Sequence, residues 1–194
     1  MSVTHTSLSL SLVCVDVWDR SDEFLEMKQK GDLPFGQLPL ASFLTESGET
    51  IVSVAQCRAI MHAVGKMSIG METPIGSDDL KTSAMIDELM DFEEDIFAAL
   101  RMSMYPQRFA LEAFKDDEAK LAMRAKITEE VLKPKLAILE TKLEKNGNKW
   151  AAGTETPTIA DFVIFTALQS LTTGIVDGGT GDMMHGVHER TLRH

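Results

Sequence analysis

The hydrophobic periodicity of the chain changes near residue 70, and this change restricts the possible folds more than any other feature. Before it, apolar residues form short runs, and across Leu8–Leu12 they alternate with serine, which is the period of a β-strand. From Ser77 onward they recur every three or four positions, as in an amphipathic helix. The sequence therefore predicts an α/β domain over residues 1–68 and an all-α domain over residues 77–194.

Short strands and helices are predicted in the first half. Alternation changes phase between residues 8–12 and 13–17, so the register of a strand there stays open. A helix is expected to start within residues 19–22 and to end at Gly31. After the breaker cluster at residues 34–36, strands over 40–44 and 50–52 are expected to flank a hairpin turn at residues 46–49.

Ser53 and Gln56 fit a capping box, in which each side chain hydrogen-bonds the backbone of the other at the start of a helix. This helix is expected to end near Gly65. Its predicted apolar face carries Cys57, Ile60 or Met61, and Val64.

Three longer helices are predicted in the second half. The first starts from a cap at residues 77–79 and ends before Pro106. Its predicted inner face is Met85, Leu89, Phe92, Ile96 and Ala99. The second runs from about residue 116 to 145 and is expected to kink at Pro134. Its predicted inner face is Ile127, Val131, Leu132, Leu136, Leu139 and Leu143.

The third helix begins at a second capping box, Thr158 with Asp161, to which we assign a structural role and no chemistry. Its predicted apolar residues are Phe162, Phe165, and Leu168 or Leu171.

Composition excludes several classes of protein. The formal net charge of −11 would repel phosphate backbones and anionic lipid, so neither nucleic acid nor a membrane is an expected partner. Cys14 and Cys57 are too few for a disulfide scaffold, which favours a reducing, cytoplasmic location. Residues 8–17 are apolar, but no Lys or Arg precedes them, so they make a poor signal peptide. No apolar run is long enough to span a membrane.

Four motifs, in a fixed order, resemble the glutathione transferases, and most closely their sigma-like class, which includes glutathione-dependent prostaglandin D synthases. They are PFGQLP at 34–39, SVAQCR at 53–58 in the place of the family's QSxAIxR, MIDELMDFEEDIF at 85–97, and KWAAGTETPTIADF at 149–162. The resemblance covers about residues 13–175. It implies a thioredoxin-like domain that binds glutathione, followed by an all-helical domain that helps to form a pocket for a small hydrophobic electrophile.

The resemblance also implies roles for individual residues of the first domain. Pro39 matches a cis proline that follows Gly36 in the motif, and the main chains of Gln37 and Leu38 would hold the cysteinyl part of glutathione. Ser53 would take the γ-glutamyl carboxylate at a helix N-terminus. Without the motif, Pro39 is a strand starter and Ser53 is a helix cap.

Three further residues complete the implied glutathione site. Phe24 and Lys28 match a W-x-x-x-K pair, with Lys28 at the glycyl carboxylate, and Asp95 matches a carboxylate that reaches across a homodimer interface. Alternatively, Lys28 is a solvent-exposed lysine without a ligand, and Asp95 belongs to an acidic, solvent-exposed face of its helix. Val52 stands where the family has a glutamine that also contacts the γ-glutamyl group.

The residue that would activate the glutathione thiol is not identifiable, so no catalytic residue is predicted. The sigma-like class uses a tyrosine near the first strand, whereas the single tyrosine here, Tyr105, ends the first long helix. Matching residues 13–19 to the family's second strand leaves about a dozen residues before it, so the first strand and first helix are expected to be missing. The Leu/Ser alternation could then cover the exposed sheet edge.

Two functions from different classes therefore stay open. One is an enzyme of glutathione-dependent detoxification that conjugates glutathione to electrophiles or uses it for isomerisation. The other is a non-catalytic module of the same fold, used for binding or structure.

The C-terminal tail suggests metal sites only superficially. His185, His188 and His194 are interpreted as part of an unstructured tail. Residues 177–182 resemble the start of a calcium loop, but the twelfth position counted from Asp177 is His188 and not the required glutamate. No metal is predicted.

Overall fold

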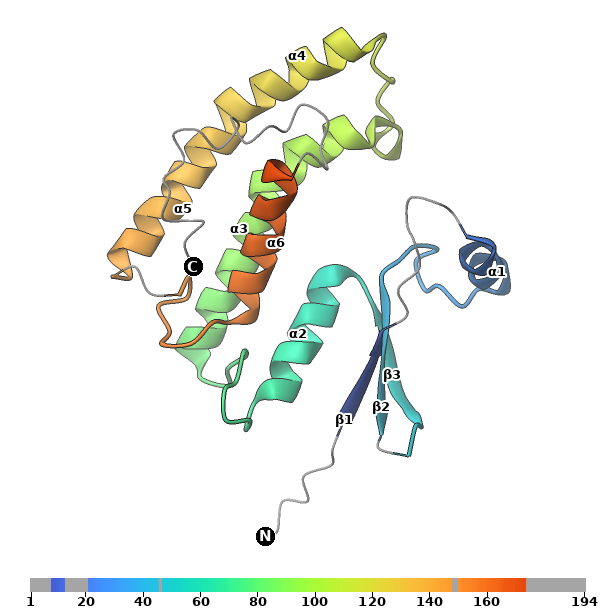
Figure 1. The fold of residues 1–194 in the computed structure, drawn as a ribbon, viewed down its shortest axis with the longest axis vertical. Coiled ribbons are helices and arrows are strands. Elements are labelled where there is room, and N and C mark those ends of the chain that lie inside the picture. Colours follow the sequence, from blue (N-terminus) through green and yellow to red (C-terminus); the bar gives the residue numbers. More distant parts are fainter. Residues whose placement is uncertain (1–7, 13–20, 46, 148–149, 174–194) are drawn as a thin grey trace. The chain divides into compact units, whose positions relative to one another are not determined.

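The computed structural model describes residues 8–12, 21–45, 47–147 and 150–173. The chain divides into two compact units, residues 1–69 and 70–194 (Figure 1). The strand predicted at residues 13–17 and the tail motifs lie outside the described residues.

The first unit is built on a three-stranded antiparallel sheet in the order β1 (Leu8–Leu12), β2 (Leu40–Thr45), β3 (Thr50–Ala55). β1 pairs with β2 over its whole length, with Leu10 opposite Phe43. The Leu/Ser segment therefore covers an edge of β2, as the alternation suggested. β3 returns beside β2 after a hairpin turn, in which the Gly48 N–H donates to the Thr45 carbonyl at 2.9 Å.

Two helices complete this unit. α1 (Asp22–Lys30) is capped by the Ser21 hydroxyl, which accepts from the Phe24 N–H, and ends at Gly31 with φ 78°, as predicted. α2 (Cys57–Ser68) packs against the sheet. The small core consists of Ala41, Phe43 and Ile60, with Val54, Ala63, Val64 and Met67 packed against it.

The predicted capping box at the start of α2 is wrong. Ser53 lies inside β3, and its hydroxyl is 2.8 Å from that of Ser42 on the neighbouring strand. The strand continues to Ala55 because Ala55 pairs with Leu40, and this cross-strand pairing outweighs the local capping signal. The helix then starts at Cys57, whose side chain is exposed rather than part of the predicted inner face.

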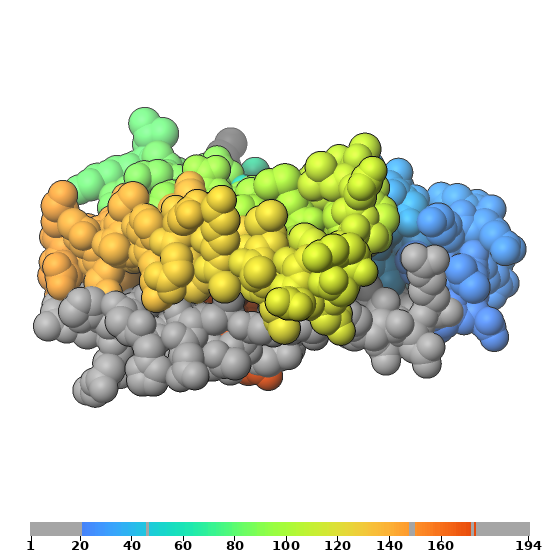
Figure 2. All heavy atoms as spheres, turned by 90° about the horizontal axis from the view of Figure 1, so that it is seen from above, coloured from blue at the N-terminus to red at the C-terminus, as the bar shows by residue number. Residues whose placement is uncertain are grey.

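The second unit consists of helices only. α3 (Leu80–Met104) and α6 (Ile159–Thr172) lie side by side (Figure 1). A short 3₁₀ helix (Pro106–Phe109) follows α3. α4 (Asp117–Ile127) continues through a π-helical turn (Thr128–Leu132) into α5 (Lys133–Lys145), and Figure 2 shows them as one ridge, yellow to orange. The largest fully buried side chains of the second unit are Leu89, Met90, Ile96, Leu100, Leu132, Leu136, Leu139, Leu168 and Leu171.

The predicted helix signals in this unit are largely confirmed. Asp79 caps α3, its carboxylate accepting from the N–H of Thr82 at 2.9 Å and from its hydroxyl at 2.8 Å. The expected interruption near Pro134 takes the form of the π-helical turn just before it. Pro134 has no N–H to donate to the carbonyl four residues back, so the regular α-helical bonding is interrupted there.

The predicted apolar residues of α6 are only partly buried. Leu168 and Leu171 are buried, but Phe162 and Phe165 are 44% and 48% exposed. The buried face of α6 instead contains the smaller residues Ala160 and Ile164, since these allow close packing. Among the helices that the structure describes, none has the length and apolarity needed to cross a membrane.

Candidate functional site

The candidate site lies at the end of the sheet where β2 begins and β3 ends. Leu40, the first residue of β2, pairs with Ala55, the last residue of β3. The segment just before β2 and the segment just after β3 therefore lie at the same end of the sheet. The first contains the Leu38–Pro39 peptide, which is cis, as the resemblance implies, and the second is Gln56–Cys57.

The main chain before β2 is accessible. Leu38 precedes the first pair of the β2–β3 ladder, so the ladder does not use its N–H and carbonyl groups. Leu38 and Pro39 are half-buried, and Gln37 is exposed. An extended peptide is recognised by such main-chain groups, which bind it as an added strand.

The first turn of α2 supplies backbone donors beside this segment. The first hydrogen bond of the helix runs from the Ile60 N–H to the Gln56 carbonyl at 3.0 Å, and Gln56 provides no side-chain cap. The N–H groups of residues 57–59 thus precede the helical ladder, at the positive end of the helix dipole. Sequence reasoning missed this start, although Val52 and Val54 are β-branched and favour a strand.

Lys28 reaches the same segment from α1. A Cβ atom added to Gly36 would lie 3.8 Å from Lys28 Cε, so the end of the lysine side chain lies close to the glycine. Gly36 has φ 64°, and its N–H donates to the Leu33 carbonyl at 2.9 Å. Phe24 lies one turn earlier on α1 and is half-buried. The structure therefore brings Lys28 and the motif at residues 34–39 together.

Other predicted residues lie elsewhere. Ser53 is exposed within β3 and faces Ser42, and Val52 is 48% exposed beside it. Asp95 is on α3 in the second unit, exposed, with its carboxylate 3.9 Å from Lys135 Nζ. Tyr105 follows α3, where the Arg108 guanidinium lies 4.6 Å from its ring centroid.

Thr158 and Asp161 form a structural cap at the start of α6. One Asp161 oxygen accepts from the Ala151 N–H at 2.7 Å, and the other accepts from the N–H and the hydroxyl of Thr158 at 2.7 and 2.8 Å. These bonds use both oxygens to fix the 150–157 segment to the helix.

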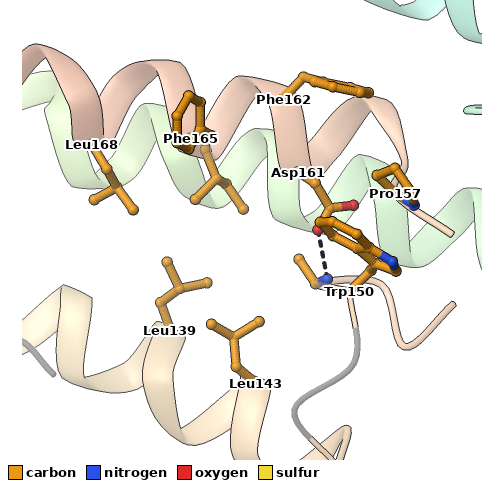
Figure 3. A pocket seen from close by; sticks show the side chains of 10 residues that line it. Leu139, Leu143, Trp150, Pro157, Asp161, Phe162, Phe165 and Leu168 are labelled. Carbon is orange, nitrogen blue, oxygen red and sulfur yellow. Dashed lines mark hydrogen bonds between the residues drawn. The ribbon is translucent and has the colours of Figure 1, made fainter. Parts of the chain in front are cut away.

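A separate apolar hollow of about 270 Å³ lies within the second unit, between α5, the segment 150–157 and α6 (Figure 3). Leucines of the two helices face each other across it, and Trp150 closes one end. In the part of the chain that the structure describes, no three His, Cys, Asp or Glu side chains form a cluster that could hold a metal ion.

Comparisons with known proteins agree with this architecture. Residues 105–183 match the family model described as glutathione S-transferase, C-terminal domain. No curated protein matches the chain. Eighteen chains of solved structures match, among them the glutathione S-transferase from Ascaris lumbricoides, with a TM-score of 0.59 and 26% identity over 89% of this chain and 72% of that one.

Two further structures share the fold at lower identity. NaGST-2 has a TM-score of 0.54 and 17% identity, covering 88% of this chain and 74% of its own. Ure2p, solved in complex with glutathione, has a TM-score of 0.51 and 16% identity, covering 90% and 79%. The chain thus has a thioredoxin-like domain followed by an all-helical domain. Residues 105–183 are thus similar to the C-terminal domain of glutathione S-transferases, and the chain as a whole is similar in fold to the Ascaris enzyme.

Proposed function

We propose that this chain binds glutathione at the sheet end defined by Leu38–Pro39 and the start of α2, as a glutathione transferase of the sigma-like class. The observation that carries the proposal is the register of Leu40 with Ala55, because it brings the Leu38–Pro39 segment to the same end of the sheet as the N–H groups in the first turn of α2. The main chains of Gln37 and Leu38 hold the cysteinyl part of the tripeptide.

The charges of glutathione fit this arrangement. Glutathione has two carboxylates, and each requires a positively charged partner. The chain has a net charge of −11, so such partners must be provided locally at the site. Lys28, whose side chain ends close to Gly36, binds the glycyl carboxylate, and Phe24 lies one turn earlier on the same helix. The γ-glutamyl carboxylate meets the N–H groups at the start of α2, with Ser53 and Val52 on the adjoining strand. Asp95 of a second copy binds the γ-glutamyl amine in a homodimer.

Isothermal titration with reduced glutathione tests this proposal. Lys28→Met is expected to weaken binding about 3–10-fold, the range for one partly exposed charge-assisted contact. Lys30→Met is the matched control, since Lys30 lies on the same helix but pairs with Glu26 at 2.6 Å. Equal affinities of the two variants, or no binding by the wild type, would exclude this site.

Catalysis is the second part of the proposal: in the cytoplasm, the bound thiol conjugates to a small hydrophobic electrophile, or serves an isomerisation. One observation favours the alternative of a non-catalytic module. The single tyrosine of the sequence, Tyr105, belongs to the second unit, at the end of α3. Turnover of a chromogenic electrophile with glutathione decides between them. If the rate is no higher than that of the uncatalysed thiolate reaction, the chain is a non-catalytic binding module.

A further inference from the structure

Hydrogen bonds hold the apolar hollow of the second unit open. Ala151, which lies between α5 and α6 in the sequence, is fixed from two sides. Its N–H donates to an Asp161 oxygen at 2.7 Å, and its carbonyl accepts from the side-chain amide of Asn146 at 2.8 Å. Asn146 ends α5 and Asp161 belongs to the first turn of α6. The segment between the helices is therefore anchored to both, so the hollow is formed by the fold itself, as ligand pockets usually are.

The residues around the hollow favour an uncharged, apolar ligand. Leu139 of α5 and Leu168 of α6 lie opposite each other across it, and each is only 1% exposed (Figure 3). Among the described residues that line it, only Asp161 is ionisable, and both its oxygens already accept hydrogen bonds within the cap of α6. A charged molecule would lose its hydration in the hollow and gain no partner in exchange.

Three aromatic side chains favour an aromatic ligand over an aliphatic one. Trp150 lies at one end of the hollow, and Phe162 and Phe165 of α6 line it while remaining 44% and 48% exposed. Aromatic rings attract one another in offset and edge-to-face contacts, which add to the effect of the area they bury. A ring bound in the hollow would gain such contacts and would cover apolar surface of these side chains.

The volume of the hollow sets the size of the ligand. An apolar cavity of about 150 Å³ in a protein accommodates one benzene molecule. The hollow here has about 270 Å³. It is therefore large enough for two fused rings but too small for most drug-sized molecules, whose pockets range from about 300 to 1,000 Å³.

We propose that this hollow binds a neutral aromatic molecule of about two fused rings, of which naphthalene is the simplest representative. The described residues that line it all belong to the second unit, whereas the candidate glutathione site belongs to the first. The hollow is thus a second binding site, and it requires no glutathione.

Isothermal titration with naphthalene, without glutathione, tests the proposal. Leu143 lines the hollow and is half-buried, so the larger side chain of Leu143→Phe should fill part of it and weaken binding by about tenfold or more. Ile138→Phe is the matched control and should bind as wild type does, because Ile138 lies on the same helix, is 58% exposed and does not line the hollow. Equal affinities of the two variants overturn the proposal, and so does a wild type that binds no naphthalene.

A charged analogue tests the predicted chemistry of the ligand. 2-Naphthalenesulfonate has the same two rings and one negative charge, and it should bind wild type about tenfold or more weakly than naphthalene does. Equal binding of the two compounds would contradict a site for neutral molecules. Since none of these titrations contains glutathione, their outcome is independent of the proposed function.

The fluorescence of Trp150 covers the case in which Leu143→Phe perturbs folding. In a Trp18→Phe background, Trp150 is the only tryptophan of the chain. Naphthalene is expected to shift its emission to shorter wavelength, when excited where naphthalene does not absorb, because the ligand displaces water from the end of the hollow where Trp150 lies. An emission spectrum that stays the same at saturating naphthalene overturns the proposal.

Discussion

Lys28 Cε lies 3.8 Å from the position that a Cβ atom on Gly36 would occupy, so the end of the lysine side chain lies close to the motif at residues 34–39. This contact joins α1 to the segment before β2.

Gly36→Ala is expected to destabilise the first unit by about 1–2 kcal/mol, because φ 64° is unfavourable for a residue with a Cβ atom. Urea denaturation measures the change. Gly48→Ala is the control, since Gly48 has φ 84° in the hairpin turn and an added Cβ would have no neighbour within 4 Å. Both variants should lose similar stability, but only Gly36→Ala should weaken glutathione binding. A matching loss of affinity in both would show that the strain, not the contact with Lys28, matters.

Asp161→Ala is expected to cost about 2–4 kcal/mol, because it removes a cap and leaves the N–H groups of Ala151 and Thr158 without their acceptor. Thermal unfolding of the second unit provides the measurement. Asp95→Ala is the control for stability, since its exposed ion pair with Lys135 at 3.9 Å is worth less than about 1 kcal/mol. Comparable shifts in the two variants would refute a special role for this cap.

Asp79 links the stability of α3 to pH. The N–H and hydroxyl of Thr82 both donate to its carboxylate and hold the pKa of Asp79 below its usual value of 3.8. Because the folded pKa is the lower one, the stabilisation is present above pH 4 and is lost as the pH falls through the folded value. The loss of stability between pH 7 and pH 3 should therefore be smaller in Asp79→Asn than in wild type. An unchanged pH dependence in Asp79→Asn would contradict this link.

Local signals predicted the elements whose ends are fixed within a few residues of sequence. Ser21 and Gly31 bound α1, and Asp79 starts α3, because a cap needs only its own turn. The start of α2 was predicted wrongly because it depends on the pairing of Ala55 with Leu40, which are distant in sequence. Similarly, the exposure of Phe162 and Phe165 follows from which side of α6 packs against α3, and hydrophobicity alone does not decide between two apolar sides.

The same distinction applies to the candidate site. The residue pattern alone identifies the motif at residues 34–39. The helix N–H groups lie beside it because of the register between β2 and β3, which a local pattern does not predict. The resemblance implies that Ser53 binds the γ-glutamyl carboxylate at a helix N-terminus, whereas the helix in the structure starts at Cys57.

Cys57→Pro tests the role of that helix start without breaking the helix. Proline is well tolerated at the first helical position, since its φ suits the helix and the N–H it lacks has no intrahelical acceptor there. The variant should keep the wild-type free energy of unfolding within about 1 kcal/mol while binding glutathione about 3–10-fold more weakly, as expected for one lost donor to a carboxylate. Cys57→Ser retains the N–H and should bind as wild type does. If both variants bind equally well, the γ-glutamyl carboxylate does not contact the N–H of residue 57.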